Sequence, residues 1–147
     1  MLYVLDTDTI IFMLRGLRAP ARQRARRDKA LALVGRCREA QTSGDSIGLS
    51  AITVSELEFG AYNSKDHDAE MVAVRKLLTP FEILDYDGAT CPPHYGRVRH
   101  ELEKSGRTIG AMDLLIAAHA LALGATLVTN NIAHFQRVSG LSVTRWP

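Results

Sequence analysis

Residues 1–10, MLYVLDTDTI, are the stretch of this 147-residue sequence that decides its fold. Four apolar residues run directly into Asp6, Thr7 and Asp8, and a helical pattern follows. An apolar run of this kind predicts a strand buried in a parallel sheet. Open α/β sheets bind their ligands at the carboxyl ends of strands, so Asp6 stands where a functional group is expected.

The composition is that of an ordinary globular domain, with 46% hydrophobic and 23% charged residues. A chain of 147 residues fits one domain, spanning 1–147, and buries roughly 70% of its unfolded surface. No apolar run approaches the roughly 20 residues of a membrane span, and the start has no signal-peptide pattern. We therefore expect a cytoplasmic protein with no membrane association, whose two cysteines, Cys37 and Cys91, are reduced thiols.

Basic residues are concentrated early in the chain. Nine of the eighteen lie between Arg15 and Arg38, where Asp28 is the only acid. Such a block suits phosphate contacts, although a solvated helix face would carry the same residues. Beside an acidic metal site the block favours nucleic acid. The residues expected to contact RNA are Arg22, Arg24, Arg26, Arg27 and Lys29.

Strand and helix patterns alternate through the rest of the chain. After the first strand we predict strands at 46–50, 81–84, 126–129 and 141–144. The helical patterns cover 9–14, 21–41, 53–62, 66–78, 92–104 and 110–123, with a short helical turn at 132–137. This alternation predicts an α/β domain with a mainly parallel sheet.

Single residues predict helix ends and faces. Gly16 and Pro20 are expected to end the first helix, and Thr53 to cap the helix at 53–62. Gly124 is expected to end the helix at 110–123. The apolar stripe of that helix is predicted to consist of Met112, Leu115, Ile116, His119 and Leu123.

Oxygen-bearing side chains follow several of the predicted strands. Because the loops after parallel strands share one edge of a sheet, these side chains could converge there. They are Asp6 and Asp8 after the first strand, Glu56 after the second, Asp113 in the first turn of the helix at 110–123, and Asn130 and Asn131 after the fourth.

Each position also has a purely structural explanation. Glu56 could complete a capping box with Thr53, and the helix dipole alone favours Asp113 near a helix start. Asn131 could cap the turn that follows it. Asp6 is the hardest to explain by structure alone. None of the five histidines has the spacing of a metal ligand or a catalytic triad.

Several carboxylates without cysteine or histidine partners suit a hard cation. Mg²⁺ and Mn²⁺ take oxygen ligands and bridge to phosphates, and a pair of such ions can promote hydrolysis of a phosphodiester. Without metal, clustered carboxylates repel, and at least one should hold its proton more tightly. The pattern therefore predicts metal dependence.

Four segments in this order resemble the PIN-domain ribonucleases, specifically VapC-type toxins of bacterial toxin–antitoxin pairs. They are LDTDTI at 5–10, LSAITVSELEFG at 49–60, GAMDLLIAAHALALGATLVTNN at 110–131 and HFQRVSGL at 134–141. The resemblance implies a Rossmann-like PIN fold, a three-layer sandwich around a sheet of about five strands. It also implies a Mg²⁺-dependent endoribonuclease, with Mn²⁺ as a substitute.

By this resemblance Asp6, Glu56 and Asp113 would hold the metal. Asn131 would join them in the catalytic set, at a position where many relatives carry a fourth acid. That difference bears on whether a second metal binds. Hydroxyls would orient the carboxylates, and Asp8 could stand in for the missing acid; the supporting residues are Thr7, Asp8, Thr129 and Asn130.

The resemblance also implies a substrate and partners. The substrate would be a structured RNA, a tRNA or ribosomal RNA, whose cleavage inhibits translation. A VapB-type antitoxin would cover the acidic cleft, and a homodimer would place two sites in one groove. Attack of water on phosphorus, without the RNA 2′-hydroxyl as nucleophile, predicts 5′-phosphate ends.

Two other functions compete with this one. In a haloacid-dehalogenase-type phosphatase, Asp6 would be the nucleophile of a DxD motif and Ser50 the second motif. That family's late acidic pair, GDxxxD, has no counterpart here. The other alternative is a non-catalytic PIN domain that binds RNA or a protein partner, for which Asn131 is the only argument.

Overall fold

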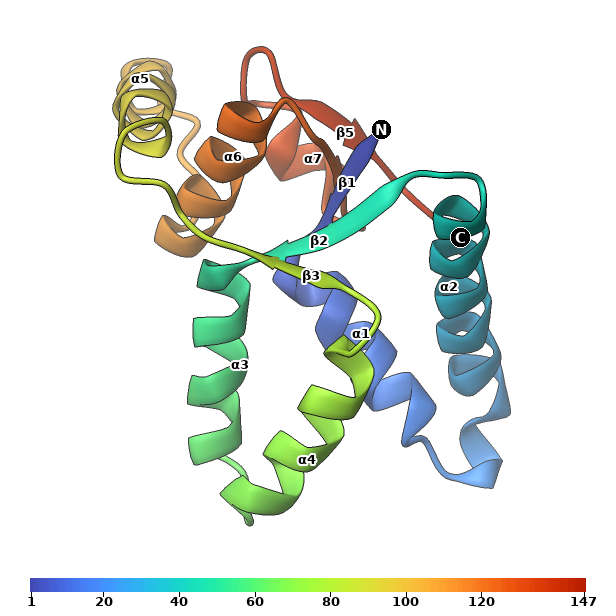
Figure 1. The fold of residues 1–147 in the computed structure, drawn as a ribbon. Helices are drawn as coiled ribbons and strands as arrows, with labels where there is room; N and C mark the ends of the chain where they lie inside the picture. The colour runs from blue at the N-terminus through green and yellow to red at the C-terminus, as the bar shows by residue number, and fades with distance from the viewer.

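The first strand, β1 (Leu2–Leu5), lies at the centre of a five-stranded parallel sheet in the computed structural model, which describes residues 1–147 (Figure 1). The strand order is β3-β2-β1-β4-β5, and every neighbouring pair is parallel. The other strands are β2 (Ser46–Ser50), β3 (Glu82–Leu84), β4 (Thr126–Val128) and β5 (Ser142–Thr144).

Helices cover both faces of the sheet. One hydrophobic core contains residues of α1 (Thr7–Leu17), α2 (Arg24–Thr42), α3 (Ala51–Tyr62) and α4 (His67–Leu78). A second core contains residues of α5 (Cys91–Lys104), α6 (Ala111–Leu123) and α7 (Ile132–Phe135). A short 3₁₀ helix, η1 (Ala21–Gln23), precedes α2. The predicted three-layer sandwich with a parallel sheet of five strands is confirmed.

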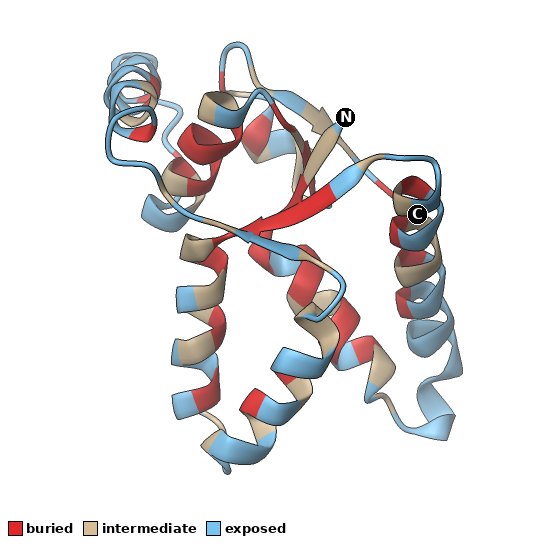
Figure 2. Ribbon diagram, viewed as in Figure 1, coloured by how far each residue is buried: buried red, intermediate tan, exposed pale blue.

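Alternation along the strands explains why both faces are apolar. Leu5 is fully buried in the core beneath α1 to α4, together with its register partners Leu49 and Val128. The preceding residue, Val4, faces the second core with its partner Leu127. Figure 2 shows β2 buried along most of its length and α5 largely exposed. A strand buried on both faces reads as an unbroken apolar run, which is the pattern of the opening residues.

Glycine allows two close approaches in the fold. A Cβ on Gly16 would lie 2.4 Å from the Cβ of Ala30, so this glycine lets α1 and α2 pack together. Gly16 lies within α1, so the prediction that the helix ends at this residue is wrong. At Gly48 an added Cβ would meet the Leu84 side chain at 2.6 Å, at the contact between β2 and β3.

Other expected details differ as well. Ser50, not Thr53, caps α3, because its hydroxyl accepts a hydrogen bond from the Ile52 amide at 3.1 Å. The stripe predicted for α6 is wrong at its ends, since Met112 is 44% exposed and Leu123 is 40% exposed. Small residues in the middle of α6 do the packing instead, and Gly124 ends the helix in a left-handed conformation as expected.

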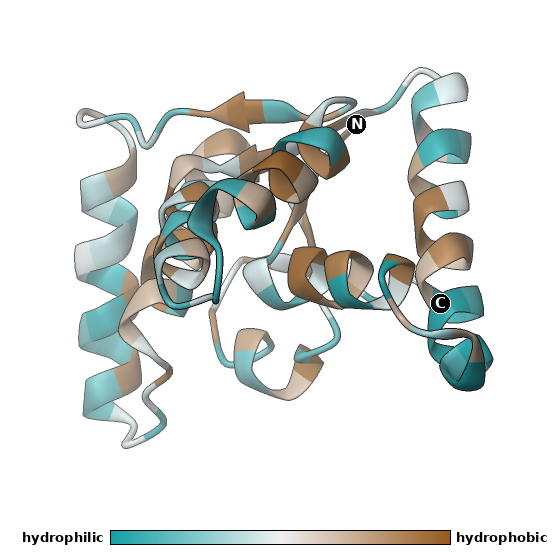
Figure 3. Cartoon of the chain, turned by 90° about the horizontal axis from the view of Figure 1, so that it is seen from below, coloured by the Kyte–Doolittle hydropathy of each residue, from teal (hydrophilic) through white to brown (hydrophobic).

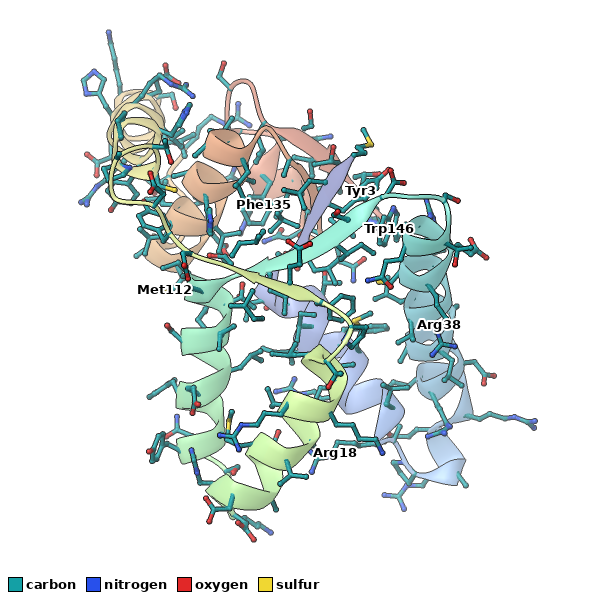
Figure 4. The ribbon with its side chains drawn as sticks, viewed as in Figure 1. Tyr3, Arg18, Arg38, Met112, Phe135 and Trp146 are labelled. Atoms are coloured by element: carbon teal, nitrogen blue, oxygen red, sulfur yellow. The ribbon has the colours of Figure 1, made fainter.

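Both cysteines are buried and unpaired. No helix of the structure is long and apolar enough to cross a membrane. The C-terminal segment packs on the core beneath α1 to α4: the ring of Trp146 lies 4.8 Å from that of Tyr3, between β1 and α2 (Figure 4).

Candidate active site

The start of α1 places Asp6 at the carboxyl edge of the sheet. Its backbone amide donates to the Val128 carbonyl at 3.1 Å, which extends the pairing of β1 with β4 by one residue. Its side chain then caps α1, accepting a hydrogen bond from the Thr9 amide at 2.8 Å. Asp6 is thus fixed from both directions, by the last strand pair and by the first helical turn.

The Asp6 carboxylate is almost fully buried. Only 3% of the residue is exposed, and its second oxygen accepts a hydrogen bond from the Thr129 hydroxyl. Burial raises the pKa of Asp6, and the hydrogen bonds from Thr129 and Thr9 oppose that rise. The negative charge of Asp8, which is exposed, adds to it. Thr129, which was expected to orient a carboxylate, thus donates its hydroxyl proton to Asp6.

Glu56 reaches the same edge from α3. Its carboxylate lies 2.7 Å from the hydroxyl of Thr7, which in turn lies 3.0 Å from the hydroxyl of Thr53. A hydroxyl has one proton and a carboxylate can only accept, so Thr7 donates to Glu56 and accepts from Thr53. The capping-box alternative is wrong, because Glu56 bonds to Thr7 across 49 residues of sequence rather than to the start of its own helix.

Asp113 completes the acidic group from the first turn of α6. Its pKa is raised to about 6, first by burial and then by the negative charges of Asp6, Asp8 and Glu56. Three negative charges thus act on Asp113 in addition to the dipole of its own helix. Asp6, Asp8 and Glu56 all act on the pKa of Asp113, and we term these four acids the acidic cluster.

The carboxylates of the acidic cluster are not gathered around one point: no three His, Cys, Asp or Glu side chains converge closely enough to hold a metal ion between them. The donors themselves are all carboxylate oxygens, which fit a hard divalent ion and exclude one that requires thiolate or imidazole ligands.

The loop after β4 contributes Thr129, Asn130 and Asn131. The Asn131 amide donates to the Thr129 hydroxyl oxygen at 2.9 Å, and its side-chain nitrogen lies 2.7 Å from Nδ1 of His134. Asn131 does not cap α7 with its side chain, so that structural explanation is wrong. Asn130 is exposed, and its carbonyl accepts from Arg145 at 3.0 Å.

A buried pair joins the helices that carry Glu56 and Asp113. Nδ1 of His119 in α6 lies 2.7 Å from the hydroxyl of Ser50, the cap of α3. His119 is 1% exposed, and burial lowers its pKa. This arrangement contradicts the phosphatase alternative, because Ser50 is 0% exposed and Asp6 has both oxygens engaged by hydrogen bonds.

The basic residues of η1 and α2 lie outside the acidic cluster. All five expected RNA contacts are exposed. Arg27 donates to the Leu17 carbonyl at 2.7 Å, and Arg26 lies 3.5 Å from the Gln23 side chain. Figure 3 shows this hydrophilic end at the edge of the molecule, away from the hydrophobic centre.

Sequence reasoning missed several residues of the site. The Thr9 amide bonds Asp6, the Thr53 hydroxyl bonds Thr7, and His134 lies beside Asn131. Ser50 bonds His119 at the contact between α3 and α6. The positive charge of His134 also lowers the pKa of Asp113. Only the dense Ser and Thr content of 50–55, next to an acid, could have pointed to the hydroxyls.

Comparison with known proteins covers nearly the whole chain. A profile of the PIN domain matches residues 3–141. The tRNA(fMet)-specific endonuclease VapC of Shigella flexneri is 31% identical over 144 residues, which are 98% of this chain and 97% of that protein. Ribonuclease VapC1 of Haemophilus influenzae is 35% identical over 147 residues, 99% and 98% of the two chains.

Solved structures of VapBC proteins are also similar to this chain over its full length. A chain of VapBC2 from Rickettsia felis, crystallised with a DNA fragment from its promoter, has a TM-score of 0.82 and 33% identity over the full length of both chains. DNA-bound VapBC from Salmonella typhimurium has a TM-score of 0.83 and 30% identity, again over both full lengths.

Proposed function

The chain belongs to the PIN-domain family, and on this basis we propose that it is a VapC-type toxin, an endoribonuclease that cleaves structured RNA and is neutralised by an antitoxin. The observation that carries the proposal is the shared electrostatics of the acidic cluster. After burial, the negative charges of Asp6, Asp8 and Glu56 raise the pKa of Asp113, which supports a single site formed by side chains from α1, α3 and α6.

We assign the metal ligands to Asp6, Glu56 and Asp113. Their oxygens fit Mg²⁺, with Mn²⁺ as the natural substitute. When bound, such an ion promotes attack of water on phosphorus and stabilises the charge on the leaving oxygen. Hydrolysis of this kind breaks the bond from phosphorus to the 3′ oxygen and leaves a 5′-phosphate.

The protein's own residues supply orientation. Thr129 and the Thr9 amide hold the two oxygens of Asp6, and Thr7 holds one oxygen of Glu56. Such supporting hydrogen bonds fix the direction of a ligating carboxylate and keep it ionised. Burial of Asp6 then keeps bulk water away from one side of the site.

We assign Asn131, with its neutral side chain, to the position of a fourth ligand. Its backbone amide donates to the Thr129 hydroxyl, and its side-chain nitrogen lies beside Nδ1 of His134. Asp8, exposed on the first turn of α1, provides negative charge near Asp6 and Asp113. We assign Asp8 the role of substituting for that acid when RNA and a second ion bind.

Two partners follow from the relatives. The similar structures from Rickettsia felis and Salmonella typhimurium are VapBC complexes, which supports a VapB-type antitoxin as the partner of this chain. A homodimer, with two acidic clusters facing one RNA, is the assembly that we propose for the free toxin.

The decisive experiment uses purified chain, tRNA and ribosomal RNA. With Mg²⁺ we expect discrete cuts bearing 5′-phosphate ends, and none in EDTA. Asp6→Asn and Asp113→Asn should abolish the cuts while leaving the circular dichroism spectrum unchanged. Asp68→Asn is the matched control, because its side chain is 97% exposed on α4 and lies outside the cluster.

Three outcomes would contradict the proposal. Full cleavage in EDTA would exclude metal dependence, and 2′,3′-cyclic phosphate ends would exclude attack by water. RNA binding without any cleavage would favour the non-catalytic alternative instead.

A further inference from the structure

A second feature lies beside the acidic cluster and has no part in the chemistry described so far. It is a hollow of about 580 Å³ between α1, the first turns of α2 and the C-terminal residues. We term it the α2 hollow. Its floor is apolar and its rim is polar; the floor consists of Phe12, Leu33 and Trp146, and the rim includes Lys29, Asn130 and Arg145.

The hollow adjoins the acidic cluster through one residue. Asn130 on its rim directly follows Thr129, whose hydroxyl donates to Asp6. Arg145 donates to the Asn130 carbonyl at 3.0 Å, which ties the C-terminal residues to this loop. The loop that fixes Asp6 thus also contributes one residue to the rim of the hollow.

The floor is held rigidly. The Trp146 ring packs against Tyr3 on one side, and the Arg36 guanidinium lies 4.7 Å from its centre. Trp146 is 7% exposed, so most of its side chain packs within the core while part of it lines the hollow. Phe12 is partly buried and packs against the same core. Together they offer a fixed apolar surface.

The rim is suited to an anion that carries a flat apolar group. Lys29 and Arg145 are both exposed and form no ion pair with an acidic residue. Asp28, also on the rim, can accept hydrogen bonds from the amino group of a base. Cationic side chains for phosphate beside an apolar surface for the base are what proteins use to bind unpaired nucleotides.

We propose that the α2 hollow binds one unpaired nucleotide of the RNA, next to the phosphate that is cut. The base lies on the floor, and Lys29 and Arg145 contact its phosphates. The volume is within the roughly 300–1,000 Å³ of small-ligand sites, so it accommodates a single nucleotide and not a duplex. This inference rests on the proposed function, because RNA as the substrate comes from there.

Trp146 provides a direct readout, because it is the only tryptophan in the chain and borders the hollow. The full-length protein in EDTA is titrated with a six-nucleotide single-stranded RNA of mixed sequence. We expect saturable quenching of tryptophan fluorescence. An equimolar six-base-pair duplex of the same sequence should quench far less.

Two variants locate the binding. Lys29→Glu should weaken RNA binding by about tenfold, the effect of losing one charge-assisted phosphate contact. Arg38→Glu is the matched control: Arg38 is exposed on the same helix, makes the same charge change and lies outside the hollow (Figure 4). Ala32→Phe, at an exposed position lining the hollow, fills it without a second tryptophan and should abolish the quenching.

The two proposals fail in different ways. If the wild type cleaves RNA but RNA does not quench Trp146, the nucleotide site is wrong and the nuclease stands. The nucleotide site is also wrong if Lys29→Glu and Arg38→Glu weaken RNA binding equally. The same holds if a protein partner quenches Trp146 fluorescence and RNA does not. Quenching without cleavage supports the nucleotide site and contradicts the nuclease.

Discussion

His119 Nδ1 and the Ser50 hydroxyl lie 2.7 Å apart in the interior, and this contact joins the two helices that carry Glu56 and Asp113. The same hydroxyl caps α3 by accepting from the Ile52 amide. One side chain thus contacts a nitrogen of a buried imidazole and caps a helix, while His119 Nε2 is buried without a hydrogen-bond partner.

Replacing this hydroxyl should destabilise the fold. Ser50→Ala leaves the Ile52 amide and His119 Nδ1 without partners, which costs about 1–3 kcal/mol of unfolding free energy. Ser55→Ala is the control, because its exposed hydroxyl only bonds the Ala51 carbonyl and its loss should change stability by less than about 0.5 kcal/mol. Urea unfolding measures both, and equal values would show that the Ser50–His119 contact contributes nothing.

Stability without metal should depend on the ionisation of Asp113. Its pKa in the folded protein is about 6, above the ordinary value of 3.8, so between these pH values the folded state holds a proton that the unfolded state has released. Stability should therefore fall as pH rises from about 4 to about 6, by roughly 1–2 kcal/mol.

Asp113→Asn tests this directly. In EDTA at pH 7 the variant should be more stable than the wild type, and its stability should change less between pH 4 and 6. Some dependence of stability on pH should remain in the variant, because the pKa of Asp6 is raised as well. Melting temperatures across this range provide the measurement, and a wild-type profile that rises with pH would contradict the assigned charges.

Thr129 should act on the reaction through Asp6. Thr129→Val removes the hydroxyl that donates to Asp6 and accepts from the Asn131 amide, and we expect cleavage to fall by about 10–100-fold. Thr129→Ser keeps the hydroxyl and should retain most of the activity. Because a merely structural role would not alter metal affinity, the Mg²⁺ concentration for half-maximal cleavage should rise in the valine variant alone.

The close packing of α1 and α2 should not tolerate an added methyl group at Gly16. A Cβ on Gly16 would approach that of Ala30 to 2.4 Å, so Gly16→Ala should cost about 1–3 kcal/mol. Adding Ala30→Gly should recover part of that loss, and the coupling in a double-mutant cycle measures the contact. By contrast, Gly35→Ala has open space around its Cβ and should stabilise α2 by about 0.5–1 kcal/mol.

The sequence was informative about strands because burial on both faces leaves a continuous apolar run. β2 was predicted with its observed bounds, and β1, β4 and β5 within one or two residues. The order of the acids along the chain also placed Asp6, Glu56 and Asp113 at one edge, since parallel strands leave their loops there.

What could not be predicted depends on contacts between distant residues. The bond from Thr7 to Glu56 spans 49 residues, and no local pattern distinguishes it from a capping box. From the sequence Gly16 was predicted to break the helix, whereas its role is to allow the close approach of Ala30. Met112 fits an apolar stripe by its spacing alone, yet lies exposed at the start of α6 beside α3 (Figure 4).

The central position of β1 has a consequence for how the protein is made. Asp6 is synthesised well before the two residues that fix it, Val128 through its carbonyl and Thr129, 123 residues later, through its hydroxyl. A nascent chain that stops before β4 lacks the strand against which Asp6 is held. The arrangement around Asp6 thus forms only after β4 and Thr129 have been synthesised, so products that stop earlier carry the acids without this geometry.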